Sequence, residues 1–183
     1  MKIFAVLGSP RRKGNTGALL EQYLKGVEEN HSDIEIITVF LQEKNIEGCR
    51  GCNICQSGKI DNCVIKDDMD ELYKKFEQSD IVVLSTPIYF FSMTSELKVF
   101  MDRLYAASHG SWKNKKFVLL TTYGDKDEIS SGAINLINII KQMTAFTRTD
   151  FIQKYGVSTG MNPNFVTQDK KSLSEVYELG KKI

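Results

Sequence analysis

The sequence predicts one α/β domain built on a doubly wound parallel sheet. Short β-branched runs alternate with longer amphipathic runs, which is the order expected when crossover helices join parallel strands. The run at 81–85 is apolar almost throughout, as expected for a strand at the buried centre of such a sheet. A chain of 183 residues is also long enough for one sizeable core. We therefore expect a single domain over residues 1–183, with five strands and helices on both faces of the sheet.

The first helix is predicted from an apolar stripe that follows the first strand. Leu19, Tyr23 and Val27 recur at helical spacing, so one face of this helix should pack on the sheet. The second helix is expected to begin at Asp67 or Asp68, because aspartate is a favoured N-cap. The expected elements of this half are a strand at 2–7, a helix at about 15–29, a strand at 34–40, an irregular segment at about 41–66, a helix to about 78 and a strand at 81–85.

The second half continues the alternation. Ser95 and Glu96 are expected to begin a helix, because Leu97, Phe100 and Leu104 then recur at helical spacing. In a parallel sheet, ligands bind beyond the carboxyl ends of the strands, so the loops after the first, third and fourth strands are the candidate binding loops. The remaining expected elements are a strand at 116–122, a polar loop at 123–128, a helix through 134–143, a strand near 151–157 and a helix at about 171–181.

Charge and composition exclude several classes of function. The chain has 24 basic and 23 acidic side chains, so no broad field attracts nucleic acid or an anionic membrane. The apolar start at 1–7 is too short for a signal-peptide core or a spanning helix. We therefore expect a cytoplasmic protein that has neither nucleic acid nor a membrane as a partner. His31 and His109 are expected to be surface histidines.

The loop after the first strand is predicted to bind a phosphate. It reads Gly8-Ser9-Pro10-Arg11-Arg12-Lys13-Gly14-Asn15-Thr16 and leads into a helix N-terminus, where unpaired amides and the helix dipole favour an anion. Short polar side chains and the Arg11 guanidinium add further donors. The spacing matches neither a triphosphate-binding P-loop nor the dinucleotide fingerprint. A plain surface turn rich in glycine and arginine is the alternative.

These residues resemble the NAD(P)H-dependent FMN reductase family, over residues 1 to about 125. Gly8-Ser9-Pro10-Arg11 with Gly14-Asn15-Thr16 is similar to its FMN-phosphate loop, and Thr86-Pro87-Ile88-Tyr89-Phe90 followed by Ser95, Leu97-Lys98 and Asp102-Arg103 looks like its flavin-ring segment. The resemblance implies a flavodoxin-like sheet of order 2-1-3-4-5, with FMN as cofactor and NAD(P)H as co-substrate. It also implies a homodimer or homotetramer with the flavin near a subunit interface. The expected phosphate-side contacts are Ser9, Arg11, Gly14, Asn15 and Thr16.

The loop after the third strand is expected to hold the flavin ring. Pro87 fixes its own backbone, and Ile88, Tyr89 and Phe90 offer apolar surface beside exposed amides. An isoalloxazine requires a flat surface to pack on and N–H donors for the negative charge that reduction adds. A run of aromatic residues after a strand can equally belong to the core, so this assignment depends on the phosphate loop.

All four cysteines lie in the long segment at about 41–66, which exceeds the usual length of a connection. The spacing Cys49-x2-Cys52-x2-Cys55-x7-Cys63 places three thiols in a tight loop that can wrap one corner of a [4Fe-4S] cluster. It resembles the compact cysteine motif of the iron-sulfur flavoproteins, a branch of the same family. The close triplet favours iron over zinc, because zinc sites usually use two separated pairs. A thiol-rich loop without metal is an equally good interpretation.

Together these features predict an FMN-dependent oxidoreductase that takes electrons from NAD(P)H or another donor. With a cluster present, it would exchange single electrons with a redox partner such as ferredoxin. Tyr123 and Gly124 are expected to form a third flavin loop by their position, although a plain turn explains them too. We expect no catalytic side chain, because hydride transfer to a flavin requires no side-chain acid or base. The alternatives are a non-enzymatic flavodoxin-like electron carrier and a zinc-binding or thiol-switch flavoprotein without a cluster.

Overall fold

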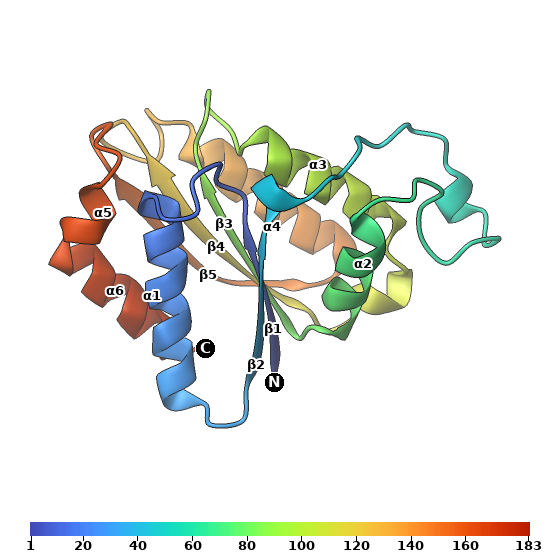
Figure 1. The fold of residues 1–183 in the computed structure, drawn as a ribbon, viewed down its shortest axis with the longest axis horizontal. Helices are drawn as coiled ribbons and strands as arrows, with labels where there is room; N and C mark the ends of the chain where they lie inside the picture. Colours follow the sequence, from blue (N-terminus) through green and yellow to red (C-terminus); the bar gives the residue numbers. More distant parts are fainter.

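A computed structural model describes residues 1–183, except for the side chain of His109, so the expectation for that side chain lies outside the described part. Five parallel strands form one sheet in the order β2-β1-β3-β4-β5 (Figure 1). The predicted fold class and strand order are therefore confirmed. The strands are β1 (Lys2–Leu7), β2 (Glu35–Phe40), β3 (Ile81–Pro87), β4 (Lys116–Tyr123) and β5 (Asp150–Ser158).

Helices cover both faces of the sheet, as Figure 1 shows. The faces differ because alternate residues of each strand point to opposite sides. Phe4, Val82 and Phe117 belong to the core under α2, α3 and α4, whereas Ile3, Val83 and Val118 belong to the core under α1 and α6. The helices are α1 (Asn15–Asn30), α2 (Met69–Gln78), α3 (Ser95–Arg103), α4 (Ala133–Thr147), α5 (Phe165–Gln168) and α6 (Lys170–Gly180).

Two glycines allow α1 and α6 to approach closely. A Cβ at Gly26 would lie 2.1 Å from the carbonyl oxygen of Tyr177, and a Cβ at Gly180 would lie 2.2 Å from that of Tyr23. Neither distance is tolerable for a real side chain, so both positions require glycine. The Tyr23 hydroxyl reaches past this crossing and donates to Gln153 Oε1 on β5 at 2.6 Å. The crossing therefore fixes α1, and with it the loop at its N-terminus, relative to the sheet.

Most predicted element boundaries agree with the structure to within one or two residues. The first strand and the start of α1 agree fully, and α3 begins at the predicted Ser95 with Thr94 as its N-cap. The helix α2 begins at Met69, whose amide donates to Asp67 Oδ1 at 3.0 Å, whereas the Asp68 side chain forms no capping hydrogen bond. The short helix α5 was not predicted, because four residues are too few to show a helical period.

The segment between β2 and α2 contains only two short 3-10 turns, Leu41–Glu43 and Ile54–Gln56. In Figure 1 this cyan to teal segment projects from the sheet edge beside α2 and α3. Its irregular course is as predicted. Within the described chain, no helix is both long and apolar enough to cross a membrane.

Candidate functional site

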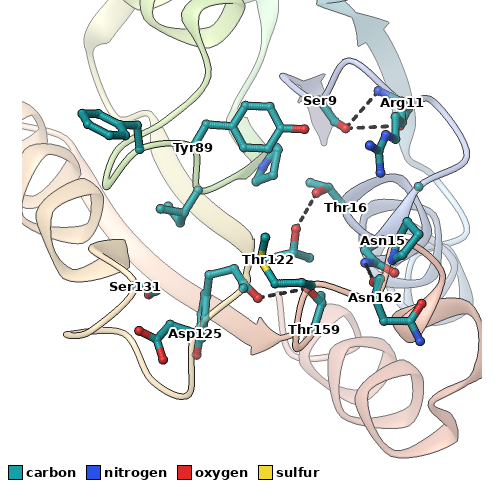
Figure 2. A pocket seen from close by; sticks show the side chains of 18 of the residues that line it. Ser9, Arg11, Asn15, Thr16, Tyr89, Thr122, Asp125, Ser131, Thr159 and Asn162 are labelled. Atoms are coloured by element: carbon teal, nitrogen blue, oxygen red, sulfur yellow. Dashed lines mark hydrogen bonds between the residues drawn. The ribbon is translucent and has the colours of Figure 1, made fainter.

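A cavity of about 520 Å³ lies at the carboxyl ends of the central strands. This volume falls within the range typical of small-molecule sites, roughly 300–1,000 Å³. Figure 2 shows Ser9, Arg11, Asn15 and Thr16 on one side of the hollow, with Tyr89 above it and Asp125 below it. All eleven residues expected to contact a flavin line this one cavity: Ser9, Arg11, Gly14, Asn15, Thr16, Pro87, Ile88, Tyr89, Phe90, Tyr123 and Gly124.

The N-terminus of α1 faces the cavity with its charge uncompensated. Gly14 occupies the N-cap and provides no side-chain cap, and the first turn contains no acidic residue. The first amides of a helix have no intrahelical acceptor, and the helix dipole places partial positive charge there. Ser9 Oγ accepts from the Arg11 amide at 3.1 Å, which holds the preceding loop in a tight turn (Figure 2). The result is a cradle suited to an anion.

The side chains of Asn15 and Thr16 are partly committed to the protein itself. Asn15 Nδ2 donates to the Asn162 carbonyl at 2.7 Å, and its Oδ1 accepts from the Val166 amide at 2.9 Å. Thr16 Oγ1 and Thr122 Oγ1 share a buried hydrogen bond of 2.7 Å. These bonds join the start of α1 to the end of β4, to the loop after β5 and to α5. Asn15 therefore fixes the shape of the cavity as much as it supplies a donor to it.

The loop after β3 presents aromatic side chains at the cavity mouth. Tyr89 is 47% exposed and Phe90 is 97% exposed. The amides of Ile88 and Tyr89 are already bonded, to the carbonyls of Thr122 and Ser92 at 2.8 Å each. Neither amide is then free to act as the expected donor to a flavin ring. The apolar surface predicted for this loop is present. Amides that donate to a flavin ring must come from positions other than Ile88 and Tyr89.

Phe90 and Phe91 have a backbone conformation that bulky residues rarely adopt. Their φ angles are 44° and 67°, in the left-handed region. The N-terminal end of α4 holds this conformation: Asn135 Nδ2 donates to the Phe91 carbonyl at 3.2 Å, and a Cβ at Gly132 would lie 2.6 Å from Phe91 Cα. Strained backbone of this kind persists only where its surroundings fix it, and such sites cluster at ligand-binding loops.

The four cysteines line a second, smaller hollow of about 60 Å³. All four are free thiols; Cys49 and Cys52 are exposed, and Cys55 and Cys63 are half-buried. Among the described side chains, no group of three His, Cys, Asp or Glu residues is gathered around a single point as a metal ion requires. The cysteines are thus near neighbours around one hollow, without the compact arrangement of a preformed mononuclear metal site.

A buried ion pair lies beneath the cysteine hollow. Arg103, at the end of α3, and Asp67 are 1% and 2% exposed, and Arg103 Nη1 lies 2.6 Å from Asp67 Oδ2. Burial raises the pKa of Asp67, but hydrogen bonds from Arg103 and from the amides of Glu47 and Met69 lower it further, so the net pKa is below its usual value. Asp67 is therefore ionised at neutral pH and compensates the Arg103 charge.

Residues 1–153 match the family described as NADPH-dependent FMN reductase. The chain belongs to this family. It is therefore an FMN reductase-like oxidoreductase, and FMN is its flavin ligand.

Curated relatives of this FMN reductase family member include iron-sulfur flavoproteins. One from Methanocaldococcus jannaschii is 31% identical over 189 residues, covering 100% of this chain and 95% of that protein. Another from Archaeoglobus fulgidus is 39% identical over 109 residues, covering 60% of this chain and 48% of that protein, so the match spans about half of that relative. Among solved structures, an azoreductase from Bacillus anthracis superposes with a TM-score of 0.78 at 15% identity, with 100% of both chains covered. This last similarity concerns the fold alone.

In this FMN reductase family member, several cavity residues escape detection from the sequence. The loop after β5 was not expected at the site, because it carries no motif and follows a strand at the sheet edge. The Asn15 hydrogen bond to Asn162 brings that loop to the cavity. The only feature of the sequence that could have indicated this loop is that it is a polar turn after the last strand. The additional lining residues are Phe91, Thr122, Asp125, Ser130, Ser131, Thr159, Met161, Asn162 and Pro163.

Proposed function

We propose that the 520 Å³ cavity holds FMN, with the phosphate at the N-terminus of α1 and the ring against the loop after β3. One observation carries the proposal: residues chosen from three separate loops line the same cavity at the carboxyl edge of the sheet. The uncompensated helix N-terminus suits a dianionic phosphate. The exposed aromatic surface at Tyr89 and Phe90 suits a flat ring. We accordingly propose a single FMN-binding domain over residues 1–183.

The protein's part in the reaction is to position the flavin and to set the charge around it. When bound, FMN supplies hydride and single-electron chemistry, here with NAD(P)H as the proposed donor. Arg11 and the α1 amides would hold the phosphate, and Pro87 with Tyr89 would support the ring. Tyr123 does not act as an acid near neutral pH, because burial and the nearby Glu128 and Asp127 charges raise its pKa. No side-chain proton donor is required for hydride transfer to the ring.

We propose further that Cys49, Cys52, Cys55 and Cys63 ligate a [4Fe-4S] cluster. Their tight spacing supports this, as does the fact that all four line one hollow. Asp102 also lines the hollow, but its carboxylate is paired with Lys98. The names of the M. jannaschii and A. fulgidus relatives support it as well. A cubane binds each thiolate at a different iron, so it does not require three ligands around one point. With a cluster, single electrons would pass to a partner such as ferredoxin.

We also propose a homodimer or homotetramer. Large apolar side chains stand exposed around the mouth of the flavin cavity, with Phe90 at 97% and Met161 at 82%. Exposed apolar groups gathered at one place are typical of surfaces that associate. Light scattering after size exclusion tests the mass in solution, and a mass of one chain at micromolar concentration contradicts this proposal.

The FMN proposal is tested by titration and turnover. FMN added to flavin-free protein should bind with a micromolar or tighter Kd, and the loaded protein should oxidise NADPH or NADH with an added acceptor. Protein that fails to bind FMN contradicts the proposed site. Binding without turnover on either nicotinamide favours the non-enzymatic electron carrier.

The cluster proposal is tested on protein purified without oxygen. About four irons and four sulfides per chain are expected for a cubane held by four cysteines. Cys52→Ser should remove the visible absorption of the cluster while FMN stays bound, whereas Lys59→Ala, an exposed change in the same segment, should leave both unchanged. Zinc without sulfide, or no metal at all, contradicts the proposal and favours the zinc-binding or thiol-switch alternative.

A further inference from the structure

One buried arginine is bonded to the backbone at both ends of the cysteine segment, residues 47–65. Arg103 Nη1 donates to the Glu47 carbonyl at 2.7 Å, just before Cys49, and Nη2 donates to the Ile65 carbonyl at 3.4 Å, just after Cys63. The side chain is 1% exposed and lines the cysteine hollow. Because the guanidinium is planar and rigid, two carbonyls bonded to it are fixed relative to each other.

Asp67 holds Arg103 in place, and we call the two side chains together the clamp. It accepts from Arg103 at 2.6 and 3.2 Å and from the Glu47 amide at 2.9 Å. The Arg103 carbonyl in turn accepts from the Tyr73 hydroxyl at 2.8 Å. Removing two charges from water costs free energy that their attraction often only offsets, so a buried ion pair adds little net stability to the fold. Its position under the cysteines therefore calls for a functional explanation.

One donor of Arg103 remains without an acceptor. Nε is buried and is the single buried side-chain nitrogen or oxygen in the described part of the chain that has no hydrogen-bond partner. Buried donors are almost always paired, so an exception marks a place where an acceptor is to be expected. Arg103 and Cys63 line the same hollow, and the Ile65 carbonyl bonded to Arg103 lies two residues after Cys63. A sulfur atom held in this hollow would give the Nε donor its acceptor.

We propose that Arg103 is a positioning residue for the iron-sulfur cluster, clamping residues 47 and 65 and donating its Nε–H to sulfur on the Cys63 side. This inference rests on the proposed cluster. A cluster with four thiolates is anionic, so an adjacent buried N–H and guanidinium stabilise it and favour its reduced state. Outer hydrogen-bond partners of metal ligands commonly control both retention and potential of a metal group.

The test compares two arginines that line the same hollow. Arg103→Lys keeps a cation for Asp67, so this variant should fold and bind FMN like the parent protein. It lacks the Nε–H donor and the planar set of guanidinium donors. Arg103→Gln removes the charge as well. The matched control is Arg50→Gln, because Arg50 is 65% exposed, lines the hollow and pairs with the Glu47 side chain at 2.7 Å.

Three measurements are made on the holoprotein: cluster loss to an iron chelator, the cluster reduction potential from a titration followed by paramagnetic resonance, and amide exchange of residues 47–65. Arg103→Lys and Arg103→Gln should lose the cluster about 10–100-fold more readily, show a more negative potential and exchange faster over the segment. Arg50→Gln should match the parent protein in all three. Bound FMN reports that each variant is folded.

The outcomes separate the two proposals. If the parent protein carries no iron and sulfide, the cluster proposal and this inference both fail. If the parent is loaded and Arg103→Lys retains its cluster with the parent's potential and exchange, the cluster stands and the role of Arg103 is refuted. Equal effects of Arg50→Gln and Arg103→Gln would also refute it, because a general effect of charge would then be sufficient.

Discussion

Two adjacent arginines in the loop after β1 have different surroundings. Arg11 lines the flavin cavity, and in the described part of the chain it forms no ion pair. Arg12 turns away from the cavity, pairs with Glu43 and lies over the Phe40 ring at 4.8 Å. Both residues lie in the loop sequence, and the family resemblance favours Arg11 because its first motif, Gly8-Ser9-Pro10-Arg11, ends there. The ion pair with Glu43 leaves Arg11 as the cation available to a phosphate.

This difference predicts unequal effects of two alanine substitutions. Arg11→Ala should weaken FMN binding about 10-fold or more, because a hydrogen bond between charged groups contributes roughly 1.5–3 kcal/mol. Arg12→Ala should change Kd less than about 2-fold, since exposed ion pairs contribute little. Quenching of flavin fluorescence measures both constants. Equal losses in the two variants would contradict the assignment of Arg11 to the phosphate.

Lys115, just before β4, is a buried lysine far along the strand from the cavity. Its Nζ donates to the carbonyls of Ser79 and Glu77 and lies over the Phe76 ring at 4.8 Å. Burial lowers the pKa of Lys115 to about 8, although the charges of Asp80 and Glu77 oppose the shift. Between this value and the ordinary value near 10.4, the unfolded chain binds more protons than the native one. Stability must therefore rise with pH in that window.

We expect Lys115 to add about 2 kcal/mol to the free energy of unfolding between pH 8 and pH 10. Above pH 10 the trend reverses, because burial raises the pKa of Tyr73 to about 12. The unfolded chain then loses the tyrosine proton before the native chain does, so stability falls as the pH rises. Lys115→Met should remove the rise, whereas the exposed neighbour substitution Lys116→Met should keep it. Urea unfolding at pH 8, 9 and 10 measures the free energy of unfolding at each pH. If this free energy rises with pH as much in Lys115→Met as in the parent protein, the prediction is refuted.

At the scale of elements, the crossing of α1 and α6 positions the phosphate cradle. Gly26 and Gly180 bring the two backbones together, and α6 in turn follows α5, whose Val166 amide is bonded to Asn15. The C-terminal helices therefore support the first turn of α1 from behind. Helical periodicity predicts both long helices, but it does not indicate that glycines on one helix face the backbone of the other.

Gly26→Ala should lower the free energy of unfolding by about 1–3 kcal/mol, because the added methyl group overpacks against the Tyr177 carbonyl. Gly48→Ala is the matched control, since an added Cβ there meets no atom within 4 Å. Its effect should stay within about 0.5 kcal/mol. Chemical denaturation measures both. A neutral or stabilising effect of Gly26→Ala would show that the two helices can separate without cost.

At the scale of the whole molecule, the flavin cavity lies where the strand order changes direction. The chain passes from β1 outward to β2 and then back across to β3, so the loops after β1 and β3 diverge and leave a crevice between them. The loops after β4 and β5 close its far side. A ligand in this crevice contacts segments that are far apart in the sequence and stabilises the entire fold.

FMN should accordingly stabilise the folded chain by about 2.7 kcal/mol when its free concentration is 100 times Kd, as expected for a ligand that binds only the native state. Thermal unfolding at several FMN concentrations measures this. Riboflavin, which lacks the phosphate, serves as the matched ligand and should stabilise much less. If both ligands stabilise equally, the phosphate is not held at α1 as proposed.

The sequence alone determined the fold class, the strand order through the family resemblance, and the three loops that carry the cavity motifs. These features depend on local patterns: apolar periodicity, a Gly- and Arg-rich turn before a helix, and clustered cysteines. Tertiary structure alone decided the separate surroundings of Arg11 and Arg12, the contribution of the loop after β5, and the clamp of Arg103 and Asp67 beneath the cysteines. Those features join residues distant in the chain, and their energies depend on burial and geometry that exist only after the chain has folded.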